Sequence, residues 1–168
     1  MLGIKTIPAA KKVATATGKD VVPKVDDIKL AGEEDDAVEV YDTCDEIRRK
    51  INAFLKKPGV TAAAFCRAIS ASHHKTPKKI SSTQLSAFRS KKGPYAGNTS
   101  AVFYGSYVYF EKLRIKEGKP KSKKRQEMEK IHGVRGGVVT DHLMETFICF
   151  GNERPSMDSF GRLTIHKK

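Results

Sequence analysis

The stretch NTSAVFYGSYVYFEKLRIKEGKP, residues 98–120, predicts the longest helix of the chain. The side chains that recur at the helical period form one face of it: Phe103, Tyr107, Phe110 and Arg114. A polar residue that can cap the helix stands at its start, namely Asn98, Thr99 or Ser100. The helix-breaking residues Gly118 and Pro120 stand at its end. Because so aromatic a segment must supply much of a core, we expect its rings to pack inside, with Tyr104 the most exposed. The alternative is that the rings stack on single-stranded bases.

Two shorter helices are indicated earlier in the chain. Ile47, Ile51 and Phe54 form the apolar side of the first, which has Thr43 at its start and stops at Pro58-Gly59. A second helix covers residues 62–70, with Thr61 as its cap. Residues 71–79 are rich in Ser, His, Pro and Lys, which indicates a loop.

A third short helix has a clear start signal. Ser81 and Gln84 fit a capping box, and Ile80 precedes them as a staple residue. Leu85 and Phe88 supply the buried side, and Gly93-Pro94 ends the helix. After the long helix, residues 122–132 predict a last, basic one.

The positive charge is concentrated in these helices and the loops between them. From Lys56 to Arg125 the chain has seventeen Lys and Arg against two acids, Glu111 and Glu117. Residues 1–40 have a net charge of −2, residues 41–132 of +14 and residues 133–168 of +1, within the total of +13. A field of this size attracts polyanions, and nucleic-acid phosphates are the commonest polyanions in a cell.

The two outer segments differ from this basic body. Residues 1–40 have no aromatic residue and no sustained period, so we expect a disordered N-terminal arm. Its acid run, residues 33–36, is interpreted as a solvated spacer or, alternatively, as a shield of the basic body.

Residues 133–168 are expected to form a C-terminal helix and an extension. The helix covers residues 140–150 and presents one apolar face, and residues 160–165 suggest a short strand. The apolar face must be covered, either by the basic domain or by a second copy of the chain, which would make a homodimer.

The order of the helices over residues 44–118 resembles the helix-turn-helix DNA-binding domains of the phage-repressor and POU-specific type. Residues 61–65 are similar to the opening of the first motif helix, and residues 81–93 to the recognition helix and its stop. The resemblance implies a mainly α, compact four- to five-helix domain over residues 41–132. Two departures leave the approach of the third helix open. Ala62 stands where the motif usually has Gln, and the connection between the two helices exceeds the usual turn of about three or four residues.

The chain also resembles an uncharacterised domain family of filamentous-fungal proteins that is usually presumed to bind DNA. The features that carry this resemblance are Cys44 to Arg48, Ser82 to Leu85 with Phe88, Lys92-Gly93, Tyr107, Phe110 to Ile115, Lys119 to Ser122, and Arg125. The family implies a fold more than a biochemical activity.

If the third helix enters a major groove, Ser90 lies on or beside its exposed side, and that side supplies the contacts to bases: Ser82, Thr83, Gln84, Ser86 and Arg89. Arg89 is the strongest of these because a guanidinium can bond two acceptors of guanine at once. Its alternative partner is Glu111, and the alternative role of Gln84 is the capping box. The residues that border this helix suit phosphate contacts, or else only solubility: Lys56, Lys57, Lys75, Lys78, Lys79, Lys91, Lys92, Asn98 and Thr99.

A basic cluster after Pro120 indicates nuclear import or a further phosphate-binding patch: Lys121, Lys123, Lys124 and Arg125. We therefore expect a nuclear protein that binds double-stranded DNA with some sequence preference and regulates transcription. The alternatives are a protein-interaction module with a solvated basic surface and a binder of structured RNA.

Other classes are not indicated. The chain has no phosphate-binding glycine loop, nucleophile elbow or metalloprotease helix, so we expect a non-enzyme without cofactor or small-molecule substrate. Cys44, Cys66 and Cys149 are far apart and no histidine stands at zinc-finger spacing from them, so we expect no metal. No apolar run approaches the roughly 18 residues that would indicate a membrane span.

Overall fold

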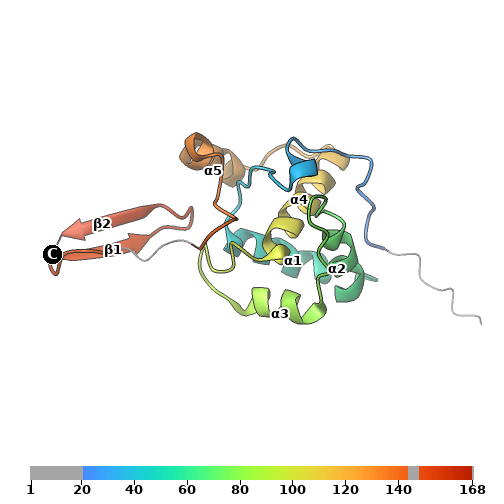
Figure 1. Ribbon diagram of the computed structural model, residues 1–168, viewed down its shortest axis with the longest axis horizontal. Helices are drawn as coiled ribbons and strands as arrows, with labels where there is room; N and C mark the ends of the chain where they lie inside the picture. Colours follow the sequence, from blue (N-terminus) through green and yellow to red (C-terminus); the bar gives the residue numbers. More distant parts are fainter. Residues whose placement is uncertain (1–20, 144–147, 168) are drawn as a thin grey trace, which may run out of the picture.

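A central helix, α4, organises the structure. The computed structural model describes residues 21–143 and 148–167. The helices are α1 (Cys44–Leu55), α2 (Ala62–Ser70), α3 (Ser82–Ser90), α4 (Ala101–Lys116) and α5 (Lys123–His132), with 3-10 turns η1 (Glu33–Asp35) and η2 (Gly133–Arg135). α1, α2 and α3 all pack on α4 (Figure 1). The fold is thus mainly helical, as expected. α2 and α3 are in contact, but residues 71–81 join them, which is longer than a helix-turn-helix turn.

The helices begin at the residues that the sequence predicts. The N-cap side chains accept a hydrogen bond from the third helical amide in every case: Thr43, Thr61, Ser81, Ser100 and Ser122. The capping box of α3 is complete, because the Gln84 side chain also accepts from the backbone amide of Ser81 at 2.9 Å. Of the three predicted caps of α4, Ser100 is the one used. These signals are local, which is why the sequence suffices to place them.

The aromatic residues of α4 form the core, as expected. Phe54 and Phe65 pack against Tyr109 and Phe110 with ring centroids 5.7 Å apart. The expectation for Tyr104 was wrong: only 6% of it is exposed, and its hydroxyl accepts a hydrogen bond from the backbone of residue 38. Phe110 is the half-buried member of the group.

α2 and α4 approach each other closely at Gly105. A Cβ atom at this position would lie 2.6 Å from the backbone oxygen of Ile69 and 3.1 Å from the His73 ring. Only glycine fits this crossing, and the close approach aligns the α2 end and the loop after it with α4.

Residues 21–40 are packed on the domain, so the expected disordered arm is wrong for this half of it. Val22, Val25 and Val40 are buried, and the Tyr109 hydroxyl donates to the Pro23 carbonyl at 3.0 Å. Figure 1 shows the segment crossing beside α4. Its contacts are made with residues far along the chain, and no hydrophobic periodicity within the segment predicts them. Residues 1–20 lie outside the described residues.

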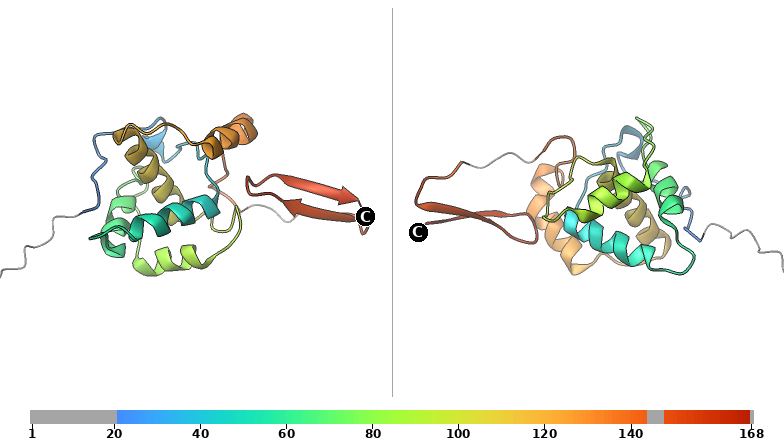
Figure 2. Two further views of the ribbon diagram at one scale, coloured as in Figure 1. Left: turned by 180° about the vertical axis from the view of Figure 1, so that it is seen from behind. Right: turned by 90° about the horizontal axis from the view of Figure 1, so that it is seen from below.

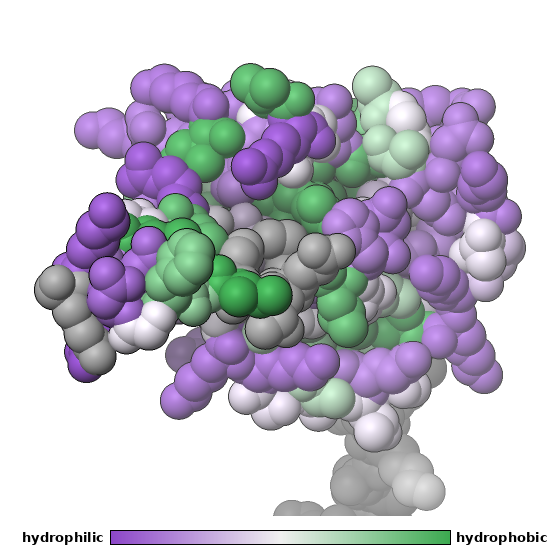
Figure 3. All heavy atoms as spheres, turned by 60° about the vertical axis from the view of Figure 1, so that its left-hand side comes forward, coloured by the Kyte–Doolittle hydropathy of each residue, from purple (hydrophilic) through white to green (hydrophobic). Residues whose placement is uncertain are grey.

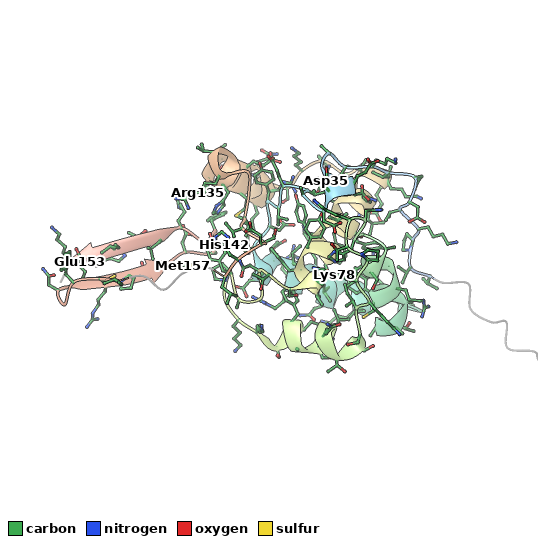
Figure 4. The ribbon with its side chains drawn as sticks, in the orientation of Figure 1. Asp35, Lys78, Arg135, His142, Glu153 and Met157 are labelled. Atoms are coloured by element: carbon green, nitrogen blue, oxygen red, sulfur yellow. The ribbon has the colours of Figure 1, made fainter. Side chains whose placement is uncertain are left out.

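The C-terminal segment ends in an antiparallel hairpin of β1 (Glu153–Met157) and β2 (Leu163–Lys167), with Met157 opposite Leu163. The turn of the hairpin rests on the helical body, because Tyr95 donates to the Gly161 carbonyl at 2.8 Å and His132 to the Phe160 carbonyl at 2.7 Å. Figure 4 accordingly shows Met157 near the body and Glu153 at the far end. The predicted strand near residues 160–165 is thus confirmed in part.

The expected helix over residues 140–150 is wrong where the chain is described, because residues 140–143 and 148–150 are not helical. Residues 144–147 lie outside the described residues. The Asn98 side chain donates to the carbonyls of Val139 and His142, at 2.9 Å each, so a tertiary partner holds the backbone in a loop. Several apolar side chains of this region are exposed, and apolar surface is visible among hydrophilic groups from this side (Figure 3): Leu143, Ile148, Phe150, Met157 and Ile165.

Candidate nucleic-acid interface

α3 presents a polar face to solvent. Its apolar side, Leu85 and Phe88, is buried and faces α2 and α4. In the view from below, α3 lies uncovered beside α1 (Figure 2). The residues on its outer side are exposed: Ser82, Thr83, Gln84, Ser86, Ala87, Arg89 and Ser90. None of them carries a negative charge, so the helix is free of repulsion toward a phosphate backbone.

The surroundings of α3 contain basic groups but few acids. The chain has no Asp or Glu from Ile47 to Phe110, a stretch that includes α2, α3 and most of α4. The exposed lysines at the ends of α3 and of α1 form no ion pair with any carboxylate of residues 21–143 and 148–167: Lys56, Lys78, Lys79, Lys91 and Lys92. We call these five the unpaired lysines. Lys57 lies with its ammonium 5.0 Å over the Phe54 ring.

Arg89 is held by α1. Its Nε donates to Oδ1 of Asn52 at 2.7 Å, and the two residues border an open depression of about 570 Å³ that also touches Lys56. The expected alternative, a pair with Glu111, is wrong, because that carboxylate accepts from Arg114 and Arg125 instead. A guanidinium has five N–H donors. The bond to Asn52 uses one of them and leaves both terminal nitrogens for an outside acceptor.

Two of the predicted base contacts, Gln84 and Ser82, have partners within the fold, and so has the neighbouring Ser90. The Gln84 oxygen is used in the capping box. The Ser82 hydroxyl is hydrogen-bonded to Cys66, and the Ser90 hydroxyl donates to the carbonyl of residue 87. Thr83 and Ser86 therefore remain as the exposed hydroxyls beside Arg89.

Two of the predicted phosphate contacts are not available as expected. Asn98 is only 1% exposed, and its amide group is used to hold the carbonyls of residues 139 and 142. Lys75 lies 4.0 Å from Asp35, so part of its charge is compensated. Thr99 is exposed, next to the cap of α4.

The predicted import cluster is largely part of the fold. Arg125 is buried, donates to the Tyr107 hydroxyl and to Glu129, and lies 4.9 Å over the Tyr41 ring. Its expected role as an exposed import residue is therefore wrong. Lys121 pairs with Glu129 at 2.7 Å and Lys124 with Glu46 at 3.5 Å, which leaves Lys123 exposed at the start of α5.

A buried ion pair that the sequence did not reveal joins η1 to α4. Glu33 accepts hydrogen bonds from the Lys112 ammonium, from the His74 ring at 2.7 Å and from the backbone of residue 30 at 2.9 Å. Burial alone would raise the pKa of Glu33, but the hydrogen bonds from Lys112, Leu30 and His74, together with the charge of Lys112, outweigh it and the pKa is lowered. The run of acids that we interpreted as a spacer is thus a structural element in part. The only sequence signal was the run itself, since its partner lies 79 positions away.

The buried cysteines show no sign of reactivity. Burial raises the pKa of the Cys44 thiol to about 12 and also raises that of Cys66. A thiol with a raised pKa is a poor nucleophile and a poor metal ligand. In the described part of the chain, no group of three or more His, Cys, Asp or Glu could hold a metal ion. Over the same residues, no helix is long and apolar enough to cross a membrane.

Comparison with known proteins adds one finding. Residues 38–120 match a family model described as "Domain of unknown function (DUF7726)". The match covers just under half of the chain, and it includes α1 to α4 together with Arg89 and the unpaired lysines. The description states no activity, fold or source, so the helix-turn-helix and fungal resemblances stay predictions. Neither the curated proteins nor the solved structures gave a match.

Proposed function

We propose that the protein binds double-stranded DNA through the exposed face of α3, with Arg89 as the principal base contact, and that it acts as a nuclear regulator of transcription. The observation that carries the proposal is the combination of this polar, acid-free face with the unpaired lysines around it. A charge without an internal partner is available to an external one, and phosphates are the natural counter-ions of such lysines.

The dimensions of α3 suit this task. A helix of nine residues is about 14 Å long, and the major groove of B-DNA is about 12 Å wide. Lys78 and Lys79 precede the helix and Lys91 and Lys92 follow it. With the helix in the groove, these two pairs lie at its opposite ends, where each can reach a phosphate. Lys56 adds a third position beside Arg89.

Asn52 supports the assignment of Arg89. The bond from Nε to Asn52 restricts the guanidinium plane before any ligand arrives. A restricted side chain loses less conformational entropy on binding, so its two terminal nitrogens can bond guanine at a smaller cost. Thr83 and Ser86 discriminate bases weakly. We therefore expect a short preferred site with one strongly specified guanine.

The test is a selection of bound duplexes from a random pool, followed by affinity measurements on the enriched sequence. Substitution Arg89→Ala should cost about 1–3 kcal/mol on that sequence and flatten the preference at one position. Arg162→Ala is the matched control, because this exposed arginine lies at the hairpin and pairs with Asp158 at 2.8 Å. An absence of binding to any duplex at low salt, or an unchanged preference after Arg89→Ala, would refute the proposal.

An RNA duplex of the enriched sequence distinguishes DNA from structured RNA. The major groove of A-form RNA is too deep and narrow for a helix, so the RNA should compete poorly if α3 enters the groove. Equal competition would favour the RNA-binding alternative.

Nuclear location is tested by a fluorescent fusion. Because Arg125 is buried, the substitutions are limited to Lys121, Lys123 and Lys124 changed to Ala together. A nuclear signal that persists in this variant would assign import to another segment, and an exclusively cytoplasmic wild type would contradict the regulatory role.

A further inference from the structure

A second candidate surface lies on the flank of α1 that faces away from α3. A groove of about 310 Å³ runs between α1, α4 and residues 119–122. On α1, Asn52 contacts α3, whereas Arg49 and Ala53 line the groove, as does Lys57 two residues after the helix. Arg49 and Ala53 are four residues apart and therefore lie on one face of the helix. The groove is separate from the face that we assign to DNA, apart from Lys57.

The floor of the groove is apolar. It is formed by Phe54, Phe110, Leu113 and Pro120. Phe110 is half-buried, and its ring lies 5.7 Å from both Phe54 and Phe65. The aromatic cluster of the core is thus open to the outside at this point. A site of this volume accommodates one or two large side chains.

On the rim of the groove, several basic side chains are each more exposed than their acidic partners. The side chain of Arg49 is 68% exposed and its partner Glu46 9%, and Lys119 is 65% exposed against 35% for Glu117. In the pairs Arg114–Glu111 and Lys50–Asp42, the basic side chain is likewise more exposed than the acidic one. The outermost charges are therefore positive although each has a carboxylate behind it, and a ligand arriving from solvent meets the cations first.

We propose that this groove binds a short segment of a partner protein in which one large apolar side chain is flanked by Asp or Glu. The apolar residue fills the space over Phe110, and the flanking carboxylates meet Arg49, Lys119 and Lys57. Such a mode combines a buried anchor with a charged rim, as docking peptides do elsewhere. A nucleic-acid backbone lacks the apolar group that the floor requires.

Two charged segments of the chain itself are unsuited to the groove. The acid run near residue 33 is already packed against α4. Residues 1–20 contain four Lys and one Asp, so their charge is of the wrong sign. The occupant that we propose is a different protein, and α3 stays free for DNA while it is bound.

The experiment is a selection from a displayed library of short random peptides on the full-length protein, followed by affinity measurement on one enriched, labelled peptide. The enriched peptides should share an aromatic or large aliphatic residue flanked by acids. No enrichment, or enrichment of basic peptides, would overturn the proposal.

The variants place the peptide. Ala53→Glu puts a carboxylate at the groove, and Arg49, four residues earlier on α1, can pair with it and keep the helix folded. This variant and Lys119→Glu should each weaken peptide binding about tenfold or more, equivalent to about 1.4 kcal/mol. The matched control, Lys130→Glu on α5, should bind within about twofold of wild type. A peptide variant with Ser in place of its apolar residue should lose binding.

Two further outcomes would also overturn the proposal. Equal affinity of wild type and Ala53→Glu for the peptide would show that the peptide does not bind in the groove. A loss on Lys91→Ala with Lys92→Ala would move the peptide to the α3 face. Because DNA binding and peptide binding are measured with different ligands, and Arg89→Ala tests only the first and Ala53→Glu only the second, failure of either proposal is seen separately from the other.

Discussion

The basic residues around α3 and those around the end of α4 differ in what surrounds them. Beside α3, Lys78, Lys79, Lys91 and Lys92 are exposed and form no ion pair with a described carboxylate. From Lys112 onward nearly every basic side chain of α4, α5 and their connection has an acid against it: Lys112 with Glu33, Lys116 with Asp27, Lys119 with Glu117, Lys121 with Glu129 and Arg125 with Glu111.

The two regions have similar composition and opposite roles. In the first, the charge has no described acid against it and is available to a phosphate backbone, and in the second it stabilises the fold or has a neighbouring acid that weakens its attraction for such a backbone. A count of Lys and Arg along the sequence cannot separate them. Whether a basic stretch forms an interface depends on the position of the acids in space.

The largest expected effect is a loss of stability when the buried Glu33–Lys112 ion pair is broken. Glu33→Ala removes the main partner of the Lys112 ammonium, whose side chain is almost fully buried. An ammonium left buried without a partner lowers the free energy of unfolding by about 3–5 kcal/mol. Urea denaturation monitored by circular dichroism measures this.

Glu34→Ala is the control for that variant. Glu34 is the next residue, and its pair with Lys29 is fully exposed on both sides, so its loss should cost under about 0.5 kcal/mol. Similar losses in the two variants would show that the Glu33–Lys112 pair carries no special weight.

A second stability difference is expected within the basic cluster at α5. Arg125→Ala should lower the free energy of unfolding by about 2–4 kcal/mol, because the Tyr107 hydroxyl, Glu111 and Glu129 lose a buried donor. Lys123→Ala, two residues earlier and exposed, should change it by less than about 0.5 kcal/mol. Thermal unfolding of both variants makes the comparison. An Arg125→Ala protein as stable as Lys123→Ala would show that the bonds of this buried arginine contribute no net stability.

The part of the fold that the sequence predicted is the part encoded locally. Ser81 and Gln84 place the start of α3 because both groups of the capping box lie within one turn. The failures concern contacts across long separations. Glu33 meets a lysine 79 positions later, and the loop carbonyls of residues 139 and 142 are held by Asn98. No period or composition marks such contacts in one sequence.

The candidate site was predictable to a similar extent. The exposed face of α3 followed from the spacing of Leu85 and Phe88, so Thr83, Ser86 and Arg89 were placed on the outside correctly. The role of Asn52 was missed, because nothing in the sequence relates α1 to the end of α3. The half-buried Phe110 was assigned to the core without the groove that it borders.

The next effect in size concerns DNA affinity. It directly tests the difference between the unpaired lysines beside α3 and the paired lysines after α4. Lys91→Ala with Lys92→Ala should weaken binding to any duplex about tenfold, or about 1.4 kcal/mol, and lower the slope of log affinity against log salt by about two. The matched double variant changes the paired residues Lys119 and Lys121 to Ala and should lose less than half of that free energy. Anisotropy titrations at several salt concentrations measure both. Equal losses would mean that pairing does not decide which lysines bind.

The smallest expected effect is a pH dependence that comes from His73. Burial lowers its pKa below 6.5, and the neutral ring donates to the Ala101 carbonyl at 3.0 Å. The unfolded chain therefore takes up this proton first as the pH falls, and stability decreases. Between pH 7 and pH 6 the free energy of unfolding should fall by under about 1 kcal/mol.

His73→Gln should flatten this pH profile even if the variant is less stable at every pH. The raised pKa of buried Asp42 acts in the opposite sense, so Asp42→Asn is measured alongside. A profile that keeps its slope in His73→Gln would assign the titration to another group.

The packing of residues 21–40 has a consequence for how the chain can be divided. A fragment limited to residues 38–120, the part matched by the family model, would keep Lys112, Tyr109 and Glu111. It would lose the Glu33 carboxylate, the Pro23 carbonyl and the Arg125 guanidinium that bind them. We therefore expect the smallest unit that folds by itself to be wider than the matched region on both sides, and to include Pro23 at one end and Arg125 at the other.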